Sequence, residues 1–230
     1  MEILYEDNHL LVCLKPVGIL CENAPSPEVS MLGLLQKQLA LPETQSFLFP
    51  VHRLDQAVGG VMVFAKTKAS AAQLSHAIQE DSFRKEYFAI VQGKVSPEEG
   101  TLQDYLYRDP AHNKTYCVKR LRKGVRTASL HYQVLSAIQE PAVLTWLKIQ
   151  LHTGRTHQIR AQFASRRLPL WGDKKYGARN CKGQIALWSY GLAFPHPVTG
   201  NLLTFYQKPP AQEPWNYFPM YKEMPQCGTI

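Results

Sequence analysis

The stretch VHRLDQAVGGVMVFAK, residues 51–66, decides how the rest of the chain is interpreted. It begins with polar residues, passes through a Gly-Gly pair and ends in an apolar run, residues 60–66, which predicts a buried strand. Asp55 comes just before this run and beside basic residues, and nearby positive charge favours the ionised carboxylate. Asp55 is therefore a candidate general base or nucleophile. The structural alternative is a pair with Arg53 or a turn cap.

Hydrophobic periodicity on both sides of this stretch predicts short strands joined mostly by hairpins, with few helices. The strands are expected at residues 3–5, 10–14, 83–95, 102–107, 129–137, 143–151, 186–194 and 201–206. Helices are expected at residues 30–39, 68–80 and 156–166, with Ser30 and Thr156 as caps. Residues 22–29, 42–50 and 170–178 are predicted loops, and the tail after Pro209 an irregular strap. This pattern is typical of an α+β fold around a largely antiparallel sheet, in one domain covering residues 1–230.

The net charge of +8 and the sequence pI of about 9.2 favour a polyanionic partner. Nucleic acid comes first and an anionic membrane surface second, against the alternative of a basic protein with no such partner. Residues 114–126 hold six basic side chains interleaved with apolar ones, and this basic ribbon predicts a twisted hairpin arm along a phosphate backbone. Its cations are Lys114, Lys119, Arg120, Arg122, Lys123 and Arg126. The alternative is a solvated face.

Several other classes of protein are disfavoured. No apolar run approaches the ~20 residues of a membrane span, and the N-terminus does not resemble a signal peptide. The five cysteines are odd in number and widely spaced, which fits a reducing cytoplasm and no disulfide framework. His152 and His157 are a weak zinc pair, so no metal is expected. Phosphate-binding, dinucleotide-binding and serine-hydrolase motifs are missing.

The remaining candidates are Asp55, Tyr87, Arg155 and the loop at residues 172–177. Arginine can pair with a carboxylate or a phosphate, and a tyrosine ring can stack on a base. Such a set suits chemistry on an anionic, aromatic substrate such as a nucleotide.

Four stretches in order resemble pseudouridine synthases of the RluA type. They are KPVG at residues 15–18, VHRLDQAVGGVMVFAKT at 51–67, RKEYFAIVQG at 84–93, and LHTGRTHQIRAQFA at 151–164 followed by GDKKYG at 172–177. They cover roughly residues 4–209, and four such motifs in sequence make a chance match improbable. The resemblance implies a pseudouridine-synthase-like fold, with a central mixed, largely antiparallel sheet flanked by helices.

The resemblance also implies an isomerase that converts uridines in rRNA or tRNA to pseudouridine. Asp55 would be the catalytic aspartate that attacks a flipped uridine at the ribose or at the base ring. Tyr87 would stack on the uracil, and Arg155 would pair with Asp55. Cleaving the N-glycosidic bond, turning the uracil and forming a C–C bond involves no redox change or net hydrolysis, so no cofactor is expected. The uridine must leave its stack to reach such a site.

The other matched residues divide into two groups. Expected RNA-binding residues are His52, Arg53, Arg160, Lys119, Arg120, Arg122 and Lys123, although His52 and Arg53 could instead fix the loop and Arg160 could instead contact Asp173. Thr156, His157, Gln158, Asp173 and Tyr176 are expected to support the site. A monomer without a membrane association is expected.

This chain departs from the family pattern at three places. Val58-Gly59 stands where Thr-Ser is common, Leu187-Trp188 stands for Leu-His, and RLPLWGD at residues 167–173 brings Trp171 toward the site. The S4-type RNA-binding domain of many relatives is not expected. Two alternatives therefore stay open: a catalytically inactive RNA-binding or RNA-folding protein, and a nucleoside or glycoside hydrolase using Asp55. The second usually needs another carboxylate across the scissile bond, and only Asp173 stands out.

Overall fold

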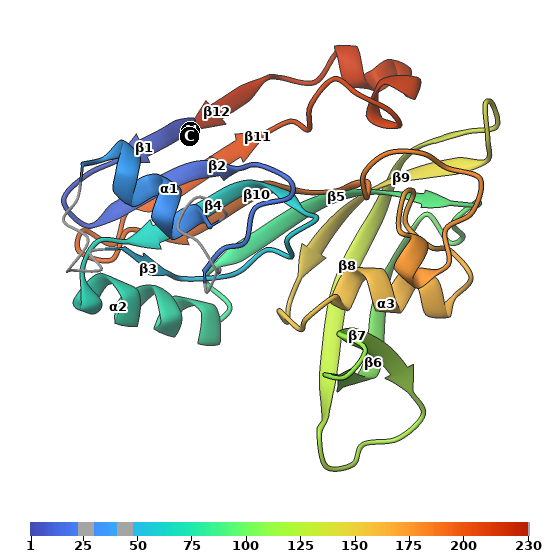
Figure 1. Cartoon of the computed structure of the whole chain (residues 1–230), viewed down its shortest axis with the longest axis horizontal. Coiled ribbons are helices and arrows are strands. Elements are labelled where there is room, and N and C mark those ends of the chain that lie inside the picture. The colour runs from blue at the N-terminus through green and yellow to red at the C-terminus, as the bar shows by residue number, and fades with distance from the viewer. Residues whose placement is uncertain (23–29, 41–47, 230) are drawn as a thin grey trace. The chain divides into compact units, whose positions relative to one another are not determined.

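The computed structural model describes residues 1–22, 30–40 and 48–229, so the predicted loops at 22–29 and 42–50 fall mostly outside the described residues. The chain forms two compact units. The first contains Met1–Lys85, Ser189–Lys208 and Pro225–Ile230, and the second contains Glu86–Trp188 and Pro209–Met224 (Figure 1). A single domain over 1–230 stays a prediction.

The first unit is built on strand β4 (Gly59–Ala65), whose seven residues are all buried. Strand β2 (Leu10–Lys15) pairs antiparallel with β4 and with β1 (Ile3–Glu6). Short β3 (Phe49–Pro50) also pairs with β4. The predicted hairpin and the buried strand beside Asp55 are therefore confirmed.

Strand β10 (Leu187–Pro195) continues the sheet of the first unit beyond β4. It pairs antiparallel with β11 (Leu202–Gln207), which pairs with β12 (Cys227–Thr229). The tail after Pro209 is thus not only an irregular strap, because its end adds a strand. Two 3-10 turns precede β12, at Trp215–Tyr217 and Pro219–Lys222.

The helices of the first unit begin at capping side chains. Helix α1 (Met31–Gln38) begins after Ser30, whose Oγ accepts the Gly33 N–H at 3.1 Å. Helix α2 (Lys68–Gln79) begins after Thr67, whose Oγ1 accepts the Ser70 N–H at 3.0 Å. Such caps satisfy backbone donors that have no partner within the helix. Both helices were predicted, and Leu74 and Ala77 of α2 join the core over β2 and β4.

The second unit is an antiparallel sheet in the order β5, β9, β8, β6, β7. These strands are β5 (Arg84–Gln92), β9 (Leu144–Leu151), β8 (Val125–Ile138), β6 (Glu99–Asp109) and β7 (Lys114–Val118). Helix α3 (Gln158–Ser165) packs against β6 and β7. Trp146 on β9 is fully buried and meets Trp215 and Phe218 of the tail edge to face. Helices with a mostly antiparallel sheet confirm the α+β class.

The basic ribbon does not form one hairpin. Its first part is β7, which pairs with β6, and its last residues begin β8, which pairs with the opposite side of β6. Residues 119–124 therefore connect two strands that have β6 between them (Figure 1). The alternation of basic and apolar residues in the ribbon predicted extended structure, but it could not predict which strand each part would pair with.

Helix α3 also begins one residue later than predicted. Its N-cap is His157, in the left-handed conformation with φ 53°, and not Thr156. Among the described residues, no helix has both the length and the apolar character needed to span a membrane.

Candidate active site

Asp55 lies in the first unit, in a tight turn directly before β4. The Asp55 carbonyl oxygen accepts the Val58 N–H at 2.9 Å, which closes this turn. The chain after β2 runs along it: Gly18 N–H donates to the Gln56 carbonyl at 2.8 Å, and the Gln56 side chain donates to the Gly18 carbonyl at 3.0 Å. The turn that carries Asp55 is therefore clamped by a segment about 40 residues earlier in the sequence.

The buried side chain of Lys15 binds the backbone of this turn. Its side chain is fully buried, and its ammonium donates to the carbonyl oxygens of Val58 at 2.8 Å, Pro16 at 3.0 Å and Gln56 at 3.2 Å. Two of these carbonyls, those of Gln56 and Val58, belong to the turn just after Asp55. Burial lowers the pKa of Lys15 to about 8, while the charges of Cys21 and Asp55 act in the opposite direction. Lys15 thus supplies both hydrogen bonds and a positive charge next to the candidate carboxylate.

Cys21 and Glu22 complete the clamp. The buried thiol of Cys21 donates to the Leu54 carbonyl at 3.2 Å, and its sulfur accepts the Leu54 N–H at 3.3 Å. Glu22 lies 3.4 Å from the guanidinium of Arg53, so Arg53 has an ion-pair partner other than Asp55. The Arg53 side chain is 72% exposed and remains available to a solvent-side ligand.

His52 is partly buried in the first unit. Its Nε2 accepts the Val63 N–H at 3.4 Å, and its ring tilts against Phe83 with 5.9 Å between the centroids. Burial, and then the charge of Lys85, lower the pKa of His52 to about 3, so the imidazole is neutral at physiological pH. A neutral, packed ring is a poor phosphate ligand. These contacts favour the loop-fixing alternative over the RNA contact expected for His52.

Lys15 gives a prediction on stability. Its pKa is 10.5 in an unfolded chain and about 8 in the fold, so unfolding takes up a proton between these values. The free energy of unfolding is therefore expected to rise with pH across this window, by about 3 kcal/mol from this group. Urea unfolding of the wild type and of Lys15→Met across the window checks it. Titrating groups that both proteins share contribute equally, so they cancel in the difference between the two free energies of unfolding. If the free energy of unfolding changed with pH equally in the two proteins, the prediction would be contradicted.

The other two expected catalytic residues lie in the second unit. Tyr87 is buried on β5, opposite Ile149 of β9. Arg155 lies in the turn before α3, and its side chain is exposed. The Arg155 Nε donates to the Thr127 carbonyl at 3.0 Å. Pairing of Arg155 with Asp55 stays a prediction.

A side-chain network fixes the turn that carries Arg155. The Gln158 amide oxygen accepts the Arg155 N–H at 3.0 Å and the Thr153 hydroxyl at 2.7 Å. The Gln158 amide nitrogen donates to the Ser129 carbonyl at 3.0 Å, and Thr153 accepts the Ser129 N–H at 2.9 Å. Gln158 therefore supports the position of Arg155, and Thr153, which was not among the predicted support residues, joins it.

Arg160 does not face solvent, contrary to the RNA contact expected for it. The Arg160 Nε and Nη2 donate to the two oxygens of Asp173 at 2.7 and 2.9 Å, and both side chains are buried. The guanidinium also lies over the Tyr176 ring, 4.9 Å from its centroid. Because its charge and donors are used inside the fold, Arg160 takes the other expected role, that of a partner for Asp173.

Tyr176 ties three segments together. Its hydroxyl oxygen accepts the Thr115 N–H of β7 at 2.8 Å and lies 3.0 Å from Nδ1 of His157. The Thr115 hydroxyl donates to the Thr156 carbonyl at 2.8 Å. Burial raises the pKa of the Tyr176 hydroxyl, which therefore keeps its proton at physiological pH. His157 and Tyr176 therefore help to fix the backbone where α3 begins. Thr156 takes part through its backbone carbonyl, which accepts the Thr115 hydroxyl.

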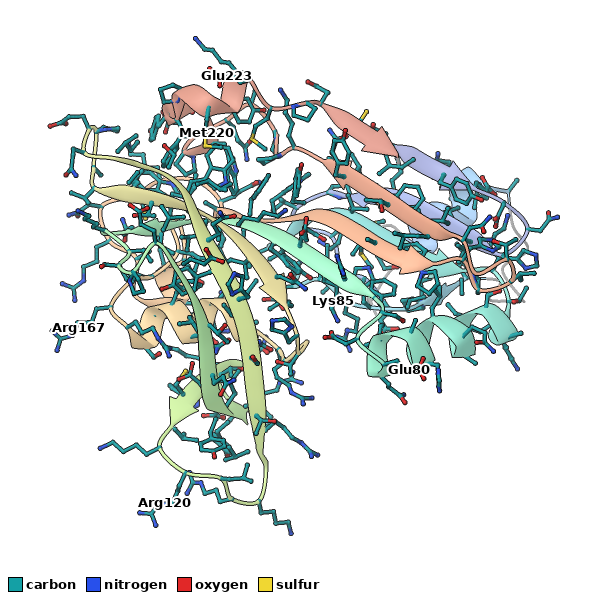
Figure 2. All side chains as sticks on the ribbon, turned by 180° about the vertical axis from the view of Figure 1, so that it is seen from behind. Glu80, Lys85, Arg120, Arg167, Met220 and Glu223 are labelled. Carbon is teal, nitrogen blue, oxygen red and sulfur yellow. The ribbon has the colours of Figure 1, made fainter. Side chains whose placement is uncertain are left out.

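The cations expected on the ribbon are at the surface. Lys119, Arg120, Arg122 and Lys123 are all exposed in the connection between β7 and β8. Arg120 projects from the end of this connection (Figure 2). The guanidinium of Arg122 lies 5.7 Å from the centre of the Tyr107 ring, an arrangement that holds the cation at the surface.

The roles of Lys15 and Cys21 as supports of the Asp55 turn were not predicted from the sequence. A lysine that closes an apolar run was a signal for Lys15, because a buried lysine needs acceptors. Cys21 gave no such signal, since its partner Leu54 is 33 residues away. Among the described residues, no cluster of three or more histidine, cysteine or acidic side chains could hold a metal ion.

Comparison with known proteins identifies the family of this chain. The profile of the RNA pseudouridylate synthase family matches residues 9–165, which include Asp55, Tyr87 and Arg155. The uncharacterized RNA pseudouridine synthase YhcT of Bacillus subtilis is 32% identical over 205 residues, which are 88% of this chain and 67% of YhcT. The dual-specificity RNA pseudouridine synthase RluA of Haemophilus influenzae is 30% identical over 215 residues, 90% of this chain and 93% of that protein.

The fold has a solved counterpart. Human RNA Pseudouridylate Synthase Domain Containing 4 superposes with a TM-score of 0.73 over 91% of this chain and 88% of the human chain, at 24% identity. This likeness supports the fold, an α+β pseudouridine synthase fold with a large, mostly antiparallel sheet. The family match and the relatives supply the rest: the chain belongs to the RluA family of RNA pseudouridine synthases, which are intramolecular isomerases, and the catalytic domain of that family covers most of it.

Proposed function

We propose that this protein isomerises specific uridines in structured rRNA or tRNA to pseudouridine, with Asp55 as the catalytic aspartate. In this reaction the N1–C1′ bond breaks, the uracil turns, a C5–C1′ bond forms, and the proton on C5 leaves to water while N1 gains one. Asp55 would attack the flipped uridine, Tyr87 would stack on the uracil, and Arg155 would pair with Asp55. The proposal includes a monomer that acts in the cytoplasm.

The observation that carries the proposal is the clamped turn around Asp55. A carboxylate that reacts with one ring needs a fixed position, because misplacement by about 1 Å can lower the rate about 100-fold. The buried Lys15 ammonium and the Cys21–Leu54 hydrogen bonds fix both sides of this turn. The turn also lies within the family match, in the motif that resembles the catalytic motif of relatives.

Loss of the C5 proton gives a direct assay for the proposal. Purified protein is expected to release tritium from 5-tritiated uridine in total RNA taken from cells that lack this gene. A pseudouridine map of those cells, with and without the restored gene, is expected to show the loss of one or a few sites. Tritium retention by every RNA fraction, with no lost site, would contradict the proposal and favour the alternative of an RNA-binding protein without catalysis, which the Val58-Gly59 departure leaves open.

The exposed ribbon gives a prediction on RNA affinity. Replacing Lys119, Arg120, Arg122 and Lys123 with Gln is expected to weaken RNA binding and to make it less dependent on salt. Each phosphate contact releases counterions when the RNA binds, and a variant with fewer such contacts releases fewer of them. The magnitude of the slope of log K against log salt should fall by up to about 3–4. Fluorescence anisotropy with a labelled hairpin RNA measures both quantities. A slope equal to that of the wild type would exclude the ribbon from the RNA interface.

A further inference from the structure

A second basic surface lies on the loop at residues 172–184, outside the ribbon. Backbone contacts close this loop at its base. Gly172 has a φ of +78°, and a Cβ there would collide with the Gln184 backbone, so the two ends of the loop touch. The Gly172 N–H donates to the Cys181 sulfur at 3.3 Å, and the Trp171 indole donates to the Lys182 carbonyl at 3.2 Å. The loop is thus pinned at both ends.

The middle of the 172–184 loop is pinned as well. Gln92 of β5 makes a two-way bond with Arg179: its amide donates to the Arg179 carbonyl at 2.6 Å and accepts the Arg179 N–H at 3.0 Å. Asp173 is held by Arg160, and Tyr176 by the Thr115 N–H. A loop with so many anchors keeps its exposed side chains in a defined arrangement.

The loop buries the side chains that anchor it and exposes its cationic side chains. Its buried residues are Asp173, Tyr176, Ala178 and Cys181, and its exposed residues are Lys174, Lys175, Gly177, Arg179, Asn180, Lys182, Gly183 and Gln184. The only acid in the loop, Asp173, is buried and neutralised by Arg160. The exposed face therefore carries four cations without an acid or a large apolar side chain.

We propose that the exposed face of the 172–184 loop binds the phosphate backbone of the substrate RNA. The inference rests on the proposed function for the choice of RNA as the anion. A face of lysine, arginine, glycine and asparagine can neutralise and hydrogen-bond phosphates but cannot bury apolar surface, so a partner with repeated anionic groups fits it best.

One cation of the ribbon borders this surface. Lys114 of β7 lies over the Tyr176 ring, 5.2 Å from its centroid, and so belongs to the edge of the loop. Phosphate contacts of this kind set affinity and register on the RNA without reading sequence.

The test replaces three loop cations and compares salt dependence. The variant Lys174→Gln/Lys175→Gln/Lys182→Gln keeps every anchor described above, because Lys182 anchors through its backbone carbonyl. The control Lys37→Gln/Lys68→Gln/Lys222→Gln removes the same charge from exposed lysines elsewhere. With a labelled hairpin RNA, the loop variant is expected to reduce the magnitude of the slope of log K against log salt by about 2–3. The control should reduce that magnitude by less than about 1.

The outcomes separate this inference from the proposed function. A loop variant with the slope of the control would overturn the loop surface, whatever the wild type does to uridine. Tritium release from 5-tritiated uridine tests the proposed function on its own. If the wild type releases no tritium and the loop variant still has a shallower slope than the wild type, the loop surface stands and the proposed isomerase activity fails. Equal melting temperatures of the three proteins establish that the folds are intact.

Discussion

Replacing Asp55 with Asn is expected to abolish tritium release from 5-tritiated uridine, with a rate lowered by a factor of about 10⁴ or more. Asn has the shape of Asp but is a far weaker nucleophile and base. The backbone bond from Val58 to the Asp55 carbonyl does not depend on the side chain, and the Lys15 bonds go to neighbouring carbonyls. The turn should therefore persist while the chemistry is lost.

RNA binding by Asp55→Asn is the matched measurement. The dissociation constant for the hairpin RNA is expected to change less than about threefold, because phosphate contacts dominate affinity. Glu223→Gln, which removes an exposed carboxylate on the tail, serves as the control and should keep full activity. An Asn variant with activity within tenfold of the wild type would remove Asp55 from the catalytic role. Loss of both activity and RNA binding would indicate a structural role instead.

Replacing Asp173 with Asn is expected to lower the free energy of unfolding by about 3–5 kcal/mol. Asp173 is 1% exposed, and it accepts both hydrogen bonds from a guanidinium that is itself buried. Neutralising Asp173 removes the negative charge that the two Arg160 hydrogen bonds meet, and a buried guanidinium that loses this charge is unfavourable in a low-dielectric interior. Urea unfolding monitored by tryptophan fluorescence measures the change.

Two variants make the Asp173 result specific. Glu86→Gln breaks an ion pair with Lys148 in which each side chain is about one-third exposed. This control should lower the free energy of unfolding by no more than about 1 kcal/mol. Arg160→Met/Asp173→Asn removes the buried guanidinium charge as well and is expected to recover part of the loss. An Asp173→Asn variant as stable as Glu86→Gln would show that the pair contributes no more than a surface contact.

Local patterns in the sequence determined the elements nearest to the candidate catalytic residue. The run of Val, Met and Phe after residue 60 predicted β4, and Ser30 predicted the start of α1, because periodicity and capping depend on residues only a few positions apart. The charge of the chain indicated a polyanionic partner. The four motifs placed Asp55, Tyr87 and Arg155 as candidates and pointed to the family that the comparisons establish.

Tertiary structure alone decided which of these residues share contacts. Cys21 meets Leu54 across 33 positions, and the carbonyls around Asp55 receive the Lys15 ammonium across more than 40. Arg160 turned inward to Asp173, and the ribbon divided between two strands on opposite sides of β6. Such pairings follow from strand register and from side chains that meet only after the chain has folded, and no local period encodes them.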